Sequence, residues 1–173
     1  MQLTRSASTS ASGEAGLIYE IVSDYGAWSE WFPGIASSKV IAQELNFAIV
    51  ELEFIAKPGV KITVECVHAP TQMVIVRSLI GNKPQLKLAW NIKPAEAGRS
   101  NVALTMNAPL SLSFLMGGFS SFFSPGNALA SLVNAVAAYG GGPSGDKIIE
   151  ITEGEEGLIC WYQGTRYQMK ELP

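Results

Sequence analysis

Between residues 36 and 108, apolar and polar residues alternate in short stretches that are separated by turn-forming residues. Alternation with a period of two gives a β-strand one apolar face and one polar face. The stretches 50–54, 60–66, 86–92 and 102–106 show it most clearly. The pattern predicts about six antiparallel strands joined by short hairpins, each with one apolar face. The apolar residues expected on the concave face of this sheet are Leu52, Phe54, Ile62, Val64, Leu86, Leu88, Trp90, Val102, Leu104 and Met106.

The residues before this region predict one strand and two short helices. Residues 2–9 alternate and suit an opening strand, after which Ser10 and Ser12 offer hydroxyls for a helix N-cap. Apolar residues between 17 and 25 recur with the spacing of a short amphipathic helix. Gly26 interrupts this helix, and an aromatic-rich second helix follows and ends at a Pro-Gly pair.

Residues 110–139 contain no charged residue and predict a long apolar helix. We expect interruptions at Gly117-Gly118 and Ser124-Pro125-Gly126, because glycine and proline disfavour a helix interior. The same interruptions come before about 20 apolar residues accumulate, which argues against a membrane span. A curved sheet covered by one long apolar helix makes a self-consistent core.

The C-terminal part of the chain predicts a separate β extension. Residues 140–146 form a glycine-rich linker by composition. Residues 147–152 and 158–163 predict two strands, and residues 167–172 are a candidate third. An extension of this length does not fold alone. Residues 147–173 are therefore expected to dock on the same domain or on a neighbouring subunit.

Composition narrows the classes of function. A chain of 173 residues suits one domain with a sizeable core. The net charge of -3 gives no basic face for nucleic acid. Cys66 and Cys160 stand far apart without metal-ligand spacing, so they predict buried thiols in a reducing compartment. The first residues lack the pattern of a signal peptide, so a cytoplasmic protein is expected.

Several residues in a fixed order resemble a known superfamily. They are Asp24, Tyr25, Trp28, Trp31, Phe32, Pro33, Gly34, Gly81, Trp90, Gly98, Arg99, Ser100, Val102 and Leu104. Their spacing is similar to that of the START/Bet v 1-like superfamily (SRPBCC), which includes polyketide cyclases and dehydrases, lipid carriers and coenzyme Q-binding proteins. The resemblance covers about residues 1–139, a helix-grip ligand-binding domain, and implies a cavity for an apolar molecule between sheet and helix.

The resemblance implies a specific α+β architecture, the helix-grip fold. A curved antiparallel sheet of about seven strands wraps on a long C-terminal helix, and two short helices follow the first strand. The tail of this chain adds a C-terminal β-hairpin to that plan.

The aromatic residues of the second short helix would lie near the mouth of the implied cavity, shared between core and entrance. Trp90 is favoured as a cavity wall, because an indole supplies a broad apolar surface and a single N–H donor. Plain core packing suits the same positions, and the sequence leaves that choice open. The candidate ligand-binding residues are Trp28, Trp31, Phe32, Phe54, Val64, Arg77, Leu88, Trp90, Leu104, Met106, Phe119, Phe122, Phe123, Leu129 and Val133.

Few residues suggest catalysis. Arg77 stands in the apolar run 73–80; an inward arginine should pair with Glu65 or a ligand oxygen, whereas an outward one would face solvent. His68, the single histidine, ends a predicted strand, which is typical of a surface or capping residue. No catalytic triad, metal-ligand set or phosphate loop is visible, so no catalytic residue, metal or cofactor is expected. For an enzyme, the acid–base candidates are Arg77, His68 and Tyr139.

Three classes of function fit these observations. The leading one is binding or transport of a hydrophobic small molecule, namely a lipid, an isoprenoid quinone or a polyketide. The second is an aromatic polyketide cyclase or dehydratase, in which a shaped cavity orients a reactive chain. The third is a homodimeric interaction module without ligand. The expected partner is an apolar small molecule and not nucleic acid, while transient membrane contact and a homodimer stay open.

Overall fold

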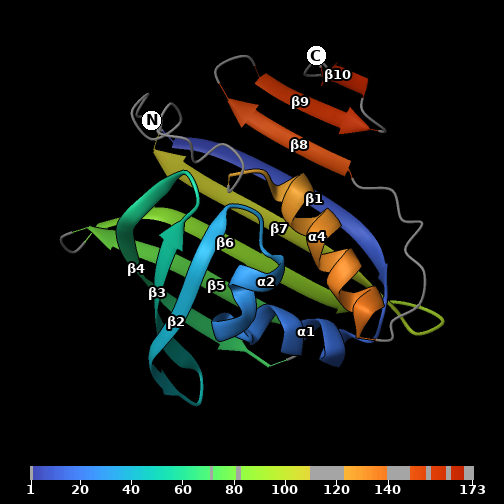
Figure 1. The fold of residues 1–173 in the computed structure, drawn as a ribbon. Coiled ribbons are helices and arrows are strands. Elements are labelled where there is room, and N and C mark those ends of the chain that lie inside the picture. The colour runs from blue at the N-terminus through green and yellow to red at the C-terminus, as the bar shows by residue number, and fades with distance from the viewer. Residues whose placement is uncertain are drawn as a thin grey trace.

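One antiparallel sheet organises the chain, and its strands follow the order β10-β9-β8-β1-β7-β6-β5-β4-β3-β2 (Figure 1). The computed structural model describes residues 2–70, 72–80, 83–109, 123–139, 149–154, 157–162 and 165–169. The strands are β1 (Gln2–Ser12), β2 (Ile35–Glu44), β3 (Phe47–Phe54), β4 (Lys57–Ala69), β5 (Met73–Ile80), β6 (Lys83–Pro94), β7 (Arg99–Pro109), β8 (Ile149–Gly154), β9 (Gly157–Tyr162) and β10 (Thr165–Met169). Strands β1 to β7 form the curved seven-stranded part that the sequence predicts, so the helix-grip architecture is confirmed.

Helices cover one face of this sheet. Helix α1 (Ala15–Ser23), the 3₁₀ turn η1 (Tyr25–Ala27) and helix α2 (Trp28–Trp31) follow β1 as predicted. Helix α4 (Pro125–Ala138) crosses β1 and β7, with α1 and α2 beside its C-terminal half (Figure 1). The face of the sheet that α4 covers is called the inner face below.

One expectation about a helix start is wrong. Ser10 and Ser12 do not cap a helix, because β1 stays paired with β7 as far as Ser12. Their hydroxyls instead accept hydrogen bonds from the Arg99 guanidinium, at 3.1 and 2.8 Å. Helix α4 begins at Pro125, within the predicted break at Ser124-Pro125-Gly126: proline suits the first turn, and the Ser124 hydroxyl accepts from the Asn127 N–H. Residues 110–122 lie outside the described part.

The inner face carries the core, and alternation predicted it well. Nine of the ten concave-face candidates are buried, and Ile62 is partly buried. The expectation that every strand has an apolar face fails for β2, most of which is exposed, including Ile41 at 54%. Strand β2 pairs only with β3 and lies at the sheet edge, so less of the protein covers it.

The C-terminal strands extend the same sheet. Strand β8 pairs antiparallel with β1, placing Thr152 opposite Arg5, and β9 and β10 follow in turn. The candidate third strand is present at residues 165–169. The predicted linker, residues 140–146, lies outside the described part. The edge of β1 opposite β7 is therefore paired within this chain.

Helix α4 approaches the start of α1 closely at Gly13. A Cβ atom at Gly13 would stand 2.9 Å from Cγ1 of Val136, closer than real Cβ contacts. The Gly13 carbonyl also accepts a 2.8 Å hydrogen bond from the buried Ser100 hydroxyl. The C-terminal half of α4 is thus held against the end of β1.

Candidate functional site

Five aromatic residues meet between the short helices and the inner face. We call this the aromatic cluster: Tyr25, Trp28, Trp31, Phe32 and Trp90. The Trp28 and Phe32 ring centroids lie 5.2 Å apart, and Trp90 on β6 meets the rings of Trp31 and Phe32 edge-on at 5.9 and 6.0 Å. Such edge-to-face contacts are favourable beyond the burial of their area. Trp28, Phe32 and Trp90 are almost completely buried, so core packing accounts for much of the cluster.

The three indole N–H groups of the cluster differ in their partners. The Trp28 N–H donates to the Val22 carbonyl at 2.9 Å. The indole nitrogens of Trp31 and Trp90 are buried and have no acceptor among the described residues. An unpaired buried donor costs about 1–3 kcal/mol, so two of them side by side need an explanation. A ligand oxygen would supply the missing acceptor.

A groove beside the cluster opens between α2 and α4. Its volume is about 460 Å³, and it is lined by Glu30, Trp31, Ser131, Asn134, Ala135, Ala138 and Tyr139. Trp31 is the residue that the groove and the aromatic cluster share. Within the second short helix, Trp28 lies in the core and Trp31 lines the groove.

The remaining wall candidates meet as a continuous apolar interior. Phe54, Val64, Leu88, Leu104 and Met106 are buried on the strands. Opposite them, Phe123 precedes α4, and Leu129 and Val133 lie on it; all three are buried. Phe119 and Phe122 lie outside the described part of the chain.

His68 is buried rather than exposed, which corrects the sequence expectation. It is 8% exposed, and both ring nitrogens are engaged. Nε2 lies 2.9 Å from the Leu45 carbonyl, which can only accept, so Nε2 carries the proton in the neutral ring. Nδ1 then accepts from the Tyr25 hydroxyl at 3.0 Å. Burial raises the Tyr25 pKa above its usual value, with smaller contributions from Cys66 and Tyr19, so this hydroxyl remains a donor.

Arg77 points away from the interior, to the outer face of the sheet. Its neighbours Val76 and Ser78 are buried, whereas Arg77 is partly exposed and binds Glu65 at 2.8 Å. Arg77 does pair with Glu65, as expected for an inward arginine, but the pair forms on the solvent side of the sheet. Tyr139 ends α4 and is 62% exposed. The three acid–base candidates are thus divided among the core, the outer face and the end of a helix.

Arg5 on β1 is an inward-facing residue that the sequence reasoning missed. The available signal was alternation: Arg5 stands between Leu3 and Ala7, which are both buried. The opening strand showed its apolar face only weakly, because alanine, serine and threonine dominate it.

The chain matches no protein-family model and no curated protein, but solved structures resemble it. The STAR-related lipid transfer protein from Xanthomonas axonopodis is 16% identical, with a TM-score of 0.60, over 75% of this chain and 83% of its own. The Zhui aromatase/cyclase from a Streptomyces species is 17% identical, with a TM-score of 0.52, over 78% and 86%. A START superfamily protein from Mycobacterium smegmatis is 15% identical, with a TM-score of 0.51, over 79% and 90%.

The fold is START/Bet v 1-like. At these identities the likeness concerns the fold alone, and such folds carry several functions. Within the described residues, no cluster of histidine, cysteine, aspartate and glutamate is suited to hold a metal ion. The described helices also include none with the length and hydropathy that a membrane crossing requires.

Proposed function

We propose that this protein binds a hydrophobic small molecule between the inner face and α4, with the groove at Trp31 as its entrance. The indole N–H of Trp90, which lies in a mostly apolar interior and has no acceptor among the described residues, carries the proposal. Ligand pockets of this kind are mostly apolar with a few polar groups that fix orientation. A carbonyl, hydroxyl or ether oxygen on the ligand would accept from this N–H, and Trp31 offers a second donor beside it.

A carrier role fits the residues better than catalysis does. General acid–base chemistry needs titratable groups that reach the same substrate. His68 is engaged through both nitrogens, and Arg77 lies on the outer face in an ion pair. The interior instead offers an apolar wall with two hydrogen-bond donors, which is sufficient to hold and orient a ligand.

Two matched compounds test the proposal: 2-acetylnaphthalene, which carries a carbonyl oxygen, and 2-ethylnaphthalene, which lacks one. Equilibrium dialysis should show that both bind and that the ketone binds about 10-fold more tightly, because a hydrogen bond contributes about 1 kcal/mol or more. Trp90→Phe should remove this preference. Native mass spectrometry of freshly purified protein, followed by solvent extraction, then identifies any natural ligand.

Trp28→Phe is the matched control, because the Trp28 N–H already has a protein acceptor. This variant should lower stability without removing the preference for the ketone. Failure of both naphthalenes to bind, together with the absence of any apolar compound that co-purifies, would overturn the proposed function.

A further inference from the structure

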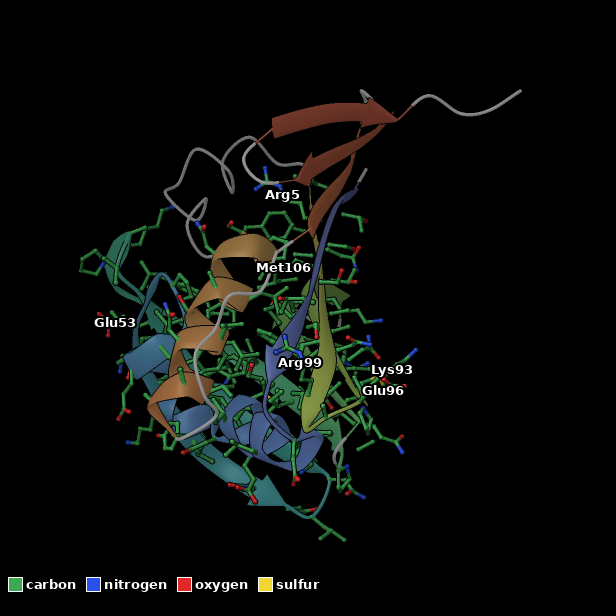
Figure 2. All side chains as sticks on the ribbon, turned by 90° about the vertical axis from the view of Figure 1, so that its right-hand side faces the viewer. Arg5, Glu53, Lys93, Glu96, Arg99 and Met106 are labelled. Carbon is green, nitrogen blue, oxygen red and sulfur yellow. The ribbon has the colours of Figure 1, made fainter. Side chains whose placement is uncertain are left out.

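Arg5 brings a positive charge to the inner face. Strand β1 alternates, so Arg5 lies on the same side as the buried residues Leu3 and Ala7. In the register its neighbours are Met106 on β7 and Thr152 on β8, neither of which is acidic. Figure 2 shows Arg5 on the side of the sheet where α4 lies, whereas Lys93 and Glu96 project from the opposite side.

The Arg5 guanidinium is only partly satisfied. Nη1 donates to the Phe123 carbonyl at 2.9 Å, and the guanidinium carbon lies 5.4 Å from the centre of the Phe123 ring. Nε is buried and has no acceptor among the described residues. A guanidinium has five N–H donors arranged to meet an anion with two of them. Arg5 is therefore held in place by Phe123 with donors to spare.

No carboxylate whose side chain the structure describes forms an ion pair with Arg5. The ion pairs of the described residues join Lys61 with Glu51 and Arg77 with Glu65. These four residues lie on β3, β4 and β5, which are not neighbours of β1 in the sheet. Between residues 94 and 145 the chain has one carboxylate, Glu96, which lies between β6 and β7 at the end of β7 away from Met106. Phe123 also stands two residues before α4, whose N-terminus carries a partial positive charge. The described surroundings of Arg5 therefore favour an anion as its further partner.

Arg5 and Trp90 lie on the same face at a defined separation. Trp90 pairs with Leu104, which pairs with Ala7, two residues along from Arg5. The two residues are thus two strands and two positions apart, or about 12 Å along the sheet at the usual strand spacing and rise. The interior between them is apolar, with Leu104 and Met106 buried.

We propose that Arg5 binds the carboxylate of an amphipathic ligand whose apolar body occupies the interior between β7 and α4. This inference rests on the proposed function and adds the class of ligand: an apolar acid rather than a neutral lipid. The guanidinium takes the carboxylate through Nε and its remaining N–H groups, and the Phe123 ring and carbonyl keep the guanidinium oriented. The apolar body then extends toward Trp90.

Oleate and oleyl alcohol, which share the same apolar chain, test this proposal in equilibrium dialysis near neutral pH, below the concentration at which oleate aggregates. Oleate should bind about 10-fold to 100-fold more tightly than the alcohol, because a hydrogen bond to a charged group contributes more than a neutral one. Arg5→Met should reduce oleate affinity to that of the alcohol and leave alcohol binding unchanged. Arg5→Lys, which keeps the charge but not the planar fork, should retain part of the difference.

Arg77→Met is the matched control, since Arg77 lies on the outer face, and oleate binding should stay at the wild-type value. Equal binding of oleate and oleyl alcohol to the wild-type protein overturns the Arg5 proposal but supports the proposed function. Binding of neither compound overturns both for this ligand class. The wild-type comparison decides the matter even if an Arg5 variant fails to fold.

Discussion

The hydrogen bond between Tyr25 and His68 should contribute measurably to stability, and Tyr25→Phe isolates it. The substitution keeps the ring, which is 1% exposed and packs on Trp28, and removes only the hydroxyl. Nδ1 of His68 then loses its donor inside a site that is 8% exposed. Leaving a buried acceptor unpaired costs about 1–3 kcal/mol, so the free energy of unfolding should fall by that amount.

Urea unfolding followed by circular dichroism measures this change, provided that the slope of the transition stays the same. Tyr139→Phe is the control, because Tyr139 is 62% exposed and its hydroxyl can bond to water; its effect should stay within about 0.5 kcal/mol. Combining Tyr25→Phe with His68→Leu should cost less than the sum of the single variants, because both remove the same bond. A Tyr25→Phe protein as stable as the wild type would refute the assignment of the His68 tautomer and its donor.

Two further predictions concern stability. Burial, with a smaller contribution from the charge of Glu65, raises the pKa of Cys66 from 9.0 to about 12. Above pH 9 the folded protein therefore keeps a proton that the unfolded chain releases. The free energy of unfolding should fall as the pH rises from 9 toward 12, by about 1 kcal/mol between pH 9 and 10. Cys66→Ala should flatten this part of the profile in urea titrations, and an unchanged profile would assign the loss to other groups. Ala97 and Gly98 both have positive φ angles, 57° and 70°, and the Arg99 N–H donates to the Glu96 carbonyl. This is the geometry of a two-residue hairpin turn, in which Asn followed by Gly is favoured at these two positions. Ala97→Asn should therefore raise stability by about 1 kcal/mol in thermal unfolding, and a lower melting temperature would contradict this interpretation of the turn.

The sequence by itself determined the strands, the short helices and most of the inner face. Alternation with period two is a local property, because a strand with one covered face must place apolar residues at every second position. Leu52, Leu88 and Leu104 could thus be assigned to the core before any partner strand was known. The order of the aromatic residues around Trp28 and Trp90 was enough to suggest the START/Bet v 1-like fold.

Only the tertiary structure decided which polar groups have partners. Whether Arg77 faces outward, whether His68 is buried, and whether the Trp90 N–H finds an acceptor depend on residues far away in the chain. The case of Arg5 is the clearest, since its partner Phe123 lies 118 residues away and β1 is too poor in large apolar residues to reveal its inner face. Hydrogen bonds and ion pairs require specific atoms at short distances, whereas burial requires only the right periodicity, so the core could be predicted and the polar contacts of the site could not.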